Sequence, residues 1–212
     1  MLPWQLPAEL PDLRRAGMIA LDLETKDDGL LAKRGSGWPW GGGHICGLSI
    51  AYRADGEIRA LYFPLRHPDT GSFDASRVFD WLKDLVASDV RIVTQNGLYD
   101  WGWLRTEADI KMPPSERLEE IGALTTLVDE NRFSYSLDSL CAWRGLPGKD
   151  ETLLREGCAA LGLIPKGCKK FNLQAQIHKL PAHLEHHGQQ VNVEPIGGAR
   201  AFLIEYWVQV LK

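Results

Sequence analysis

Met18-Ile19-Ala20-Leu21-Asp22-Leu23-Glu24-Thr25 is an apolar stretch that closes on two carboxylates one residue apart. Alternate side chains of a β-strand share a face, so Asp22 and Glu24 are expected to point the same way. Two like charges at the end of a mostly buried strand are costly unless a cation lies between them, and a divalent ion is the usual solution. A solvated strand end with two harmless acids explains the same residues. The pair alone leaves both interpretations open.

Composition indicates one globular domain that spans residues 1–212. The chain has 212 residues, of which 44% are hydrophobic and 25% charged, enough for a sizeable core. It has no apolar segment of membrane-spanning length and no secretory signal pattern, so we expect a cytoplasmic protein without a membrane partner. The formal net charge of −4 argues against a protein that holds long duplexes through many phosphate contacts. It suits an acidic, metal-holding pocket with a short nucleic-acid footprint.

Cysteine spacing argues against two small-domain scaffolds. None of the four cysteines forms a closely spaced pair of the kind found in zinc ribbons or disulfide frameworks; they are Cys46, Cys141, Cys158 and Cys168. We therefore expect reduced thiols.

The first half of the chain predicts a sheet. Residues 45–52 and 58–63 are rich in β-formers and are separated by the turn-prone Ala54-Asp55-Gly56. Together with the strand that begins at Met18, they predict an antiparallel three-stranded meander. Residues 90–93 predict a further short strand, which leads through Gln95-Asn96-Gly97 into a helix from Leu98 onward.

Helical periodicity begins at Asp74. After it, apolar residues recur at i, i+3, i+4, i+7 and i+8, namely at Val78, Trp81, Leu82, Leu85 and Val86. Ser72 or Asp74 could cap the helix. Further helices are predicted near residues 118–128, 137–144, 151–161 and 199–211. The pattern as a whole predicts a mixed α/β domain in which the first half builds the sheet and the second half supplies helices around it.

The glycine-rich loop at residues 33–43 carries two cations and two aromatics: Lys33, Arg34, Trp38 and Trp40. Exposed tryptophans beside cations can stack on unpaired bases while the charges meet phosphates. Tryptophans also tend to be buried, so a hydrophobic plug folded over the sheet edge is the alternative. The sequence does not choose between the two.

A second acidic position follows the strand at residues 90–93. Asn96 and Asp100 are four residues apart at the start of the predicted helix, so they are expected to lie on one face, one turn apart. Asp-x-Glu-Thr at a strand end, Asn-x-x-Tyr-Asp after a strand, and the stretch at residues 127–140 occur in the order found in the DnaQ-like, or DEDD, 3′→5′ exonucleases. The chain resembles this family over residues 17 to about 184, in particular the proofreading domains of family A DNA polymerases of phages.

That resemblance implies an RNase H-like α/β fold, with a mixed central sheet flanked by helices. It also implies four carboxylates that hold two Mg²⁺ or Mn²⁺ ions on the terminal phosphodiester. Asp22 would bridge both ions, Glu24 would bind the nucleophile-side ion, and Asp100 would serve the leaving-group side. Thr25 and Asn96 would contact or position the terminal nucleotide.

The residue types suit this chemistry. One ion lowers the pKa of a bound water, and the other stabilises the leaving 3′ oxygen. Such hard ions prefer the oxygen ligands of Asp and Glu. Tyr99 is expected to pack into the core, since a helix residue next to a site residue points elsewhere.

The third motif of the family is altered in this chain. The position of its Tyr is occupied by Gly188 and that of its last Asp by Asn192, while His187 stands at the distance from Asn192 that the His form of the motif would require. Asn192 offers a carbonyl oxygen without negative charge, so three acids remain where the family has four, and metal affinity should fall. Glu120 also occupies a place where the family usually has Asp.

Two functions follow from this pattern. The first is a 3′→5′ exonuclease that releases nucleotides from single-stranded or frayed DNA 3′ ends, with proofreading through a separate DNA polymerase in a bacterial or phage-infected cell. The alternative is a catalytically impaired module that binds nucleic-acid ends or a protein partner, as Gly188 and Asn192 suggest. RNA stays open as a substrate, because metal chemistry does not distinguish the sugars.

Overall fold

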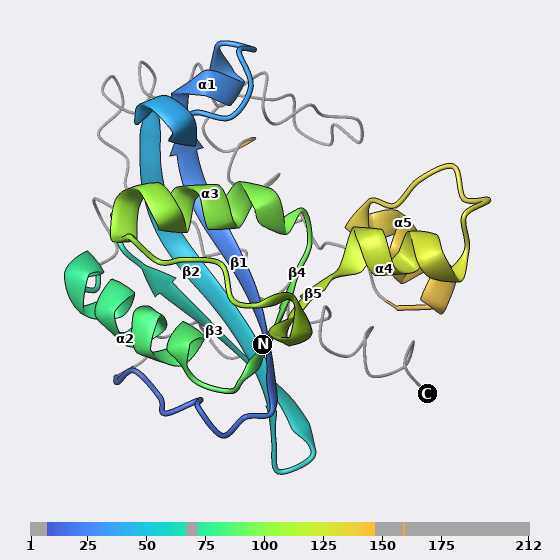
Figure 1. Cartoon of the computed structure of the whole chain (residues 1–212), viewed down its shortest axis with the longest axis horizontal. Helices are drawn as coiled ribbons and strands as arrows, with labels where there is room; N and C mark the ends of the chain where they lie inside the picture. Colours follow the sequence, from blue (N-terminus) through green and yellow to red (C-terminus); the bar gives the residue numbers. More distant parts are fainter. Residues whose placement is uncertain (1–7, 67–71, 147–158, 160–212) are drawn as a thin grey trace.

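The computed structural model describes residues 8–66, 72–146 and 159. Its centre is a five-stranded sheet with the order β3-β2-β1-β4-β5 (Figure 1). The strands are β1 (Met18–Asp27), β2 (Gly43–Ala54), β3 (Glu57–Pro64), β4 (Arg91–Thr94) and β5 (Leu118–Glu120). The first three pair antiparallel, whereas β4 runs parallel to β1 and β5 parallel to β4. The mixed α/β fold is confirmed.

The predicted meander forms from local features of the sequence. Asp55 and Gly56 both have positive φ values, 52° and 81°, which suits the tight hairpin turn between β2 and β3. β1 pairs with β2 over most of its length, with Asp22 opposite Ser49 and Glu24 opposite Gly47. The register shifts between Glu24 and Thr25, so a bulge follows the second acid directly.

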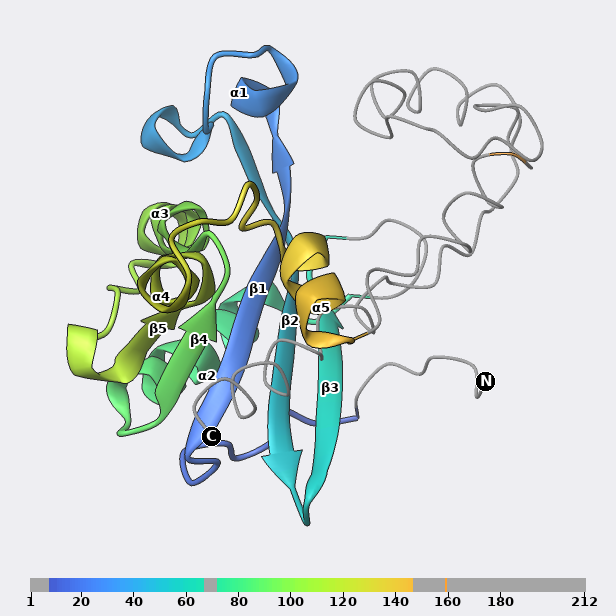
Figure 2. The same cartoon turned by 90° about the vertical axis from the view of Figure 1, so that its right-hand side faces the viewer.

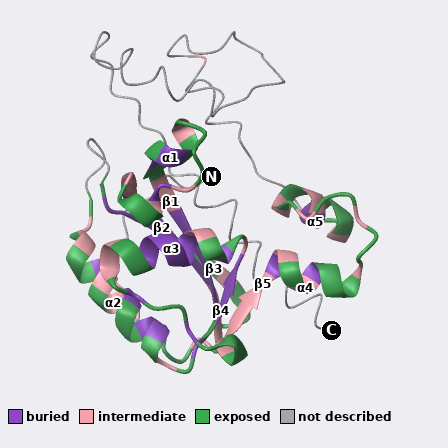
Figure 3. Cartoon of the chain, turned by 45° about the horizontal axis from the view of Figure 1, so that its top comes forward, coloured by how far each residue is buried: buried purple, intermediate pink, exposed green. Residues whose placement is uncertain are grey.

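Two helices cover one face of the sheet. They are α2 (Ala75–Ala87), capped by the Asp74 side chain, and α3 (Gly97–Ala108). Odd-numbered β1 residues share the core with them, namely Ile19, Leu21 and Leu23. In Figure 3, the middle of α3 is buried, whereas α2 alternates buried and exposed positions as an amphipathic helix does.

The second pair of helices lies on the opposite face. α4 (Ile121–Val128) and α5 (Leu137–Arg144) contribute Ile121 and Leu140 to a smaller cluster with Ala20, Ala51 and Val93. Figure 2 shows α5 in front of β1 and β2. Because Ala20 alternates with Ile19 and Leu21, this cluster is on the other side of the sheet from α2 and α3.

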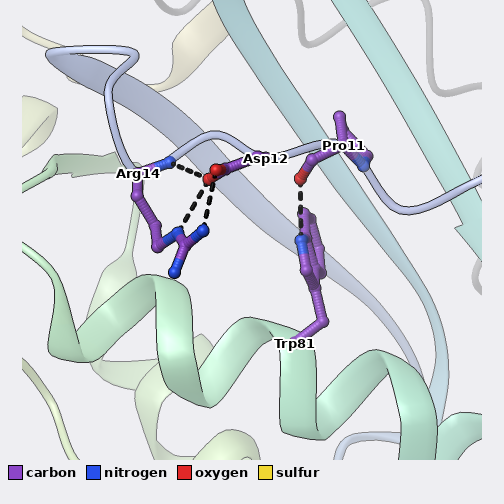
Figure 4. Close-up of polar contacts among 4 residues, drawn as sticks. All are labelled: Pro11, Asp12, Arg14 and Trp81. Carbon is purple, nitrogen blue, oxygen red and sulfur yellow. Dashed lines mark hydrogen bonds and ion pairs between the residues drawn. The ribbon is translucent and has the colours of Figure 1, made fainter.

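The segment before β1 is held against α2. The indole nitrogen of Trp81 donates to the Pro11 carbonyl at 2.8 Å, and Arg14 forms an ion pair with Asp12 at 2.8 Å (Figure 4). Between this segment and α2 lies a surface cavity of about 220 Å³.

Several sequence predictions need correction. Residues 118–120 were expected to begin a helix, but they form β5, because pairing with Ile92, Val93 and Thr94 satisfies their backbone in a parallel ladder. Two short elements between β1 and β2 were not predicted: α1 (Asp28–Leu31) and the 3-10 turn η1 (Trp38–Trp40).

Other predictions lie wholly or largely beyond the described residues. The helices expected at 151–161 and 199–211 fall there, apart from residue 159, and the assignment of residues 1–212 to one domain stays a prediction. In the part of the chain that the structure describes, no helix is both long and apolar enough to cross a membrane.

Candidate functional site

β1 places Asp22 and Glu24 on one face, as the alternation predicted. Their neighbours Leu21 and Leu23 face the main core on the other side. Asp22 is buried, with 6% of its surface exposed, and Glu24 is half-buried. The two acids therefore do not form a freely solvated strand end.

Asp100 joins this strand from α3. It lies in the first turn of the helix and is only 3% exposed. Burial raises its pKa to about 8; a backbone hydrogen bond from Leu23 opposes the shift, and the charge of Glu24 adds to it. The contact with Leu23 and the influence of Glu24 show that the helix brings Asp100 to the acidic end of β1. The carboxyl group of Asp100 therefore keeps its proton to a higher pH than an exposed acid does, unless a cation compensates the negative charge.

Asn96 precedes α3 and is not part of the helix. It has a φ of 62°, its side chain makes no capping hydrogen bond, and the residue is exposed, in contrast to Asp100. Its backbone N–H donates to Glu120 Oε1 at 2.6 Å, and Glu120 Oε2 accepts from the N–H of Ala123 at 2.7 Å. Glu120 therefore caps α4 and also ties it to the turn that carries Asn96, a role that the sequence did not suggest.

Thr25 takes part in a hydrogen-bonded chain. Its Oγ1 lies 2.7 Å from the Tyr99 hydroxyl, which donates to Asp27 Oδ2 at 2.8 Å. Tyr99 has one proton to donate, so Thr25 is the donor in the first contact. Burial, together with the nearby Asp27, raises the pKa of Tyr99 to about 12, although the bond from Thr25 opposes this.

Tyr99 therefore has two roles. Its ring packs edge-on against Trp103, with the ring centres 6.5 Å apart, which agrees with the predicted core packing. Its hydroxyl links β1 to α3, which sequence reasoning missed.

The two tryptophans of the glycine-rich loop have different surroundings. Trp38 is half-buried and lies over α3, where a Cβ at Gly102 would overlap its indole ring. Trp38 is therefore partly buried as in the plug alternative, but it packs on α3 rather than over the sheet edge. Trp40 is 54% exposed, and stacking on a base stays a prediction for this residue.

Tyr62 is a further residue near the acids that the sequence did not single out. It is buried on β3, its ring covers Gly47 opposite Glu24, and any Cβ at position 47 would overlap it. Burial, together with the charges of Glu24 and Cys46, raises the pKa of Tyr62. Glycine inside a strand marks such a close approach, and this was the available signal.

The three acids have the right chemistry for a hard divalent ion, but their side chains are not gathered closely enough to form a complete binding site. Asp22, Glu24 and Asp100 supply only oxygen ligands, which Mg²⁺ and Mn²⁺ prefer. Within residues 8–66 and 72–146, however, no three Asp, Glu, His or Cys side chains gather closely enough to hold a metal ion. Gly188, His187 and Asn192 lie outside the described residues. None of the predicted site residues lines the cavity beside α2.

Comparison with known proteins finds a similarity to a phage polymerase. The chain is 29% identical over 168 residues to a DNA-directed DNA polymerase of Pseudomonas phage M6, a match that covers 77% of this chain and 24% of the polymerase. The chain thus spans about a quarter of the length of that relative. No protein-family model matches the chain.

Proposed function

We propose that the chain is a metal-dependent 3′→5′ exonuclease with an RNase H-like fold that acts on DNA 3′ ends. The observation that carries the proposal is the position of Asp100, buried against the Leu23 backbone under the influence of Glu24. A buried acid beside another acid is costly to ionise, and functional sites are where such arrangements concentrate. The mixed sheet with helices on both faces and the similarity to a phage DNA polymerase support this proposal.

Each residue has a distinct part in the proposed reaction. Asp22, Glu24 and Asp100 would hold the ions, and Asp100 must release its proton to do so. When bound, the ions would lower the pKa of the attacking water and stabilise the leaving oxygen. Thr25, oriented by Tyr99, and the exposed Asn96 would position the terminal nucleotide. Proofreading alongside a polymerase is the cellular role that we propose for this activity.

A nuclease assay tests the proposal directly. The chain is incubated with 5′-labelled single-stranded DNA and Mg²⁺ or Mn²⁺, and stepwise shortening from the 3′ end is expected. Asp22→Ala and Asp100→Asn should abolish shortening, whereas Asp80→Asn, which removes an exposed carboxylate on α2, should retain it. The proposal fails if neither ion supports loss of 3′ nucleotides. A labelled RNA of the same sequence shows which sugar is preferred.

A binding module with impaired catalysis is the second candidate. It is favoured by Asn192 and Gly188 and by the absence of a three-ligand group among the described residues. Asn192→Asp, alone and with Gly188→Tyr, separates the candidates. A large rise in activity would identify a degraded site, whereas an active parent that Asp22→Ala inactivates would identify an enzyme.

A further inference from the structure

The loop between β1 and β2 is closed by its own backbone hydrogen bonds. Trp40 and Gly42 both donate to the Gly37 carbonyl, at 3.2 and 3.0 Å, and Asp28 donates to the Gly42 carbonyl at 2.9 Å. Gly37 is surrounded so closely that a Cβ would overlap the Gly42 carbonyl. The glycines at positions 37 and 42 therefore serve close packing, and the loop has a defined shape.

Asp27 anchors this loop to the rest of the fold. It is 5% exposed and accepts hydrogen bonds from the N–H of Leu30 at 2.9 Å, the N–H of Gly37 at 2.9 and 3.0 Å, and the Tyr99 hydroxyl at 2.8 Å. Burial opposes ionisation, but these hydrogen bonds outweigh it and hold the pKa of Asp27 below its usual value. The same carboxylate thus fixes α1, the glycine-rich loop and α3 relative to the end of β1.

The loop presents one tryptophan to solvent in a restricted orientation. Trp38 is held on Gly102, while Trp40 extends its indole over Gly42, where a Cβ would lie 2.8 Å from the indole nitrogen. More than half of the Trp40 surface is exposed. An exposed indole that is ordered in advance loses little conformational entropy when a flat ligand stacks on it.

The exposed charges of the loop are positive. Lys33 and Arg34 are both exposed near Trp40 in the chain, in a protein whose formal net charge is −4. The acid at Asp28 lies 3.9 Å from Lys26, so these two charges offset each other. A cationic loop with an exposed aromatic ring suits a flexible polyanion with unpaired bases.

We propose that this loop is a stacking platform for single-stranded DNA and that Asp27 is its positioning residue. Trp40 stacks on an unpaired base, Lys33 and Arg34 contact phosphates, and Asp27 holds the loop beside Thr25 at the acidic end of β1. The proposal rests on the proposed exonuclease function for its substrate class, and it adds where the strand lies before its end is cut.

Binding is measured without catalysis. The full chain, in EDTA, is titrated into a short fluorescein-labelled oligothymidylate, and binding is followed by fluorescence anisotropy. The label is needed because the protein has eight tryptophans, so its intrinsic fluorescence does not report on Trp40 alone. Trp40→Ala should weaken binding about tenfold or more, and Trp40→Phe much less. Replacing Lys33 and Arg34 by Ala should reduce the slope of log K against log salt by about 0.7 per cation.

A control comes from Trp143 on α5, which is 37% exposed and whose ring centre lies 4.1 Å from the Arg132 guanidinium. Trp143→Ala should leave binding unchanged. The proposal is overturned if Trp40→Ala binds like the parent or if Trp143→Ala weakens binding equally. If the chain binds DNA through Trp40 but never cuts it, the exonuclease proposal is refuted and the stacking platform is retained. If the chain cuts DNA without needing Trp40, the stacking platform is refuted and the exonuclease proposal is retained.

The role of Asp27 is tested by a double-mutant cycle. Asp27→Asn should weaken oligothymidylate binding, and adding it to Trp40→Ala should cost little more, because both changes remove the same contact. In the nuclease assay with single-stranded DNA, either variant should raise KM with little change in kcat. Two outcomes would show a merely structural role for Asp27. One is full additivity of the two changes in the binding cycle. The other is a fall in kcat for Asp27→Asn when Trp40→Ala changes neither KM nor kcat.

Discussion

Asp100 carries a carboxyl group that folding removes from water. Its pKa in the folded chain is raised to about 8 from the ordinary value of 3.8, so the native state keeps a proton that the unfolded state releases. The retained proton contributes to the free energy of unfolding. This contribution is complete below about pH 4 and is lost as the pH rises toward 8, by at most about 1.4 kcal/mol per pH unit. We predict that Asp100→Asn removes this dependence.

The measurement is urea denaturation in EDTA at several pH values between about 4 and 8. The free energy of unfolding of the parent should fall relative to that of Asp100→Asn across this range. Asp80→Asn, at an exposed position, should follow the parent. Parallel curves for the parent and Asp100→Asn would contradict the assigned burial.

Glu120 joins two elements through one carboxylate. Its oxygens accept from the N–H groups of Asn96 and Ala123, so Glu120→Ala removes an N-cap and a tie between α4 and the turn before α3. We expect a loss of about 1–2 kcal/mol in the free energy of unfolding, and a smaller loss for Glu120→Gln, which keeps one acceptor oxygen. Urea denaturation of both variants tests this, with exposed Glu116→Ala as the unaffected control. Equal stability of Glu120→Ala and Glu116→Ala would refute it.

The end of α2 is stabilised by a side chain from another element. Arg117, in the short 3-10 turn η2 (Ser115–Arg117), donates through Nη1 to the carbonyls of Val86 at 3.0 Å, Ser88, and Val90 at 3.5 Å. Carbonyls at a helix end have no partners within the helix, and a cation is favourable there. Arg117 thereby ties the α2 end to the start of β5.

We predict that Arg117→Ala lowers the free energy of unfolding by about 2 kcal/mol, the scale of hydrogen bonds to a charged group. Arg117→Lys should retain part of this, since the ammonium keeps the charge but not the guanidinium geometry. Arg77→Ala, an exposed arginine on α2, is the matched control in thermal and urea unfolding. The prediction is wrong if both alanine variants unfold alike.

At the scale of the whole molecule, a bound ion would link β1 to α3. Anything that binds the native state alone raises its stability, by about 2.7 kcal/mol at a ligand concentration a hundredfold above Kd. We predict that Mn²⁺ raises the Tm of the chain in a concentration-dependent way and that EDTA reverses this. Glu24→Gln should abolish the shift, and Asp80→Asn should retain it. A shift that survives Glu24→Gln would place the ion elsewhere.

Much of the fold was predictable because its signals are local. The strand containing Ile19 and Leu21, the Asp55-Gly56 turn and the periodic helix after Asp74 each depend on neighbouring residues, and the structure confirms all three. The helix expected from residue 118 was wrong in its first turn. A parallel ladder with β4 determines those residues, and no local window contains that partner.

Part of the candidate site was likewise predictable from the sequence, and the rest depends on tertiary contacts. That Asp22 and Glu24 share a face follows from the sequence, since the side-chain period of a strand is set by backbone geometry. The tertiary structure alone decided that Asp100 lies under the influence of Glu24, that Trp38 is covered while Trp40 is exposed, and that Asp27 holds the loop. These features depend on contacts between segments distant in the chain, whose free energy comes from burial and hydrogen bonds that form only when the sheet and α3 pack together.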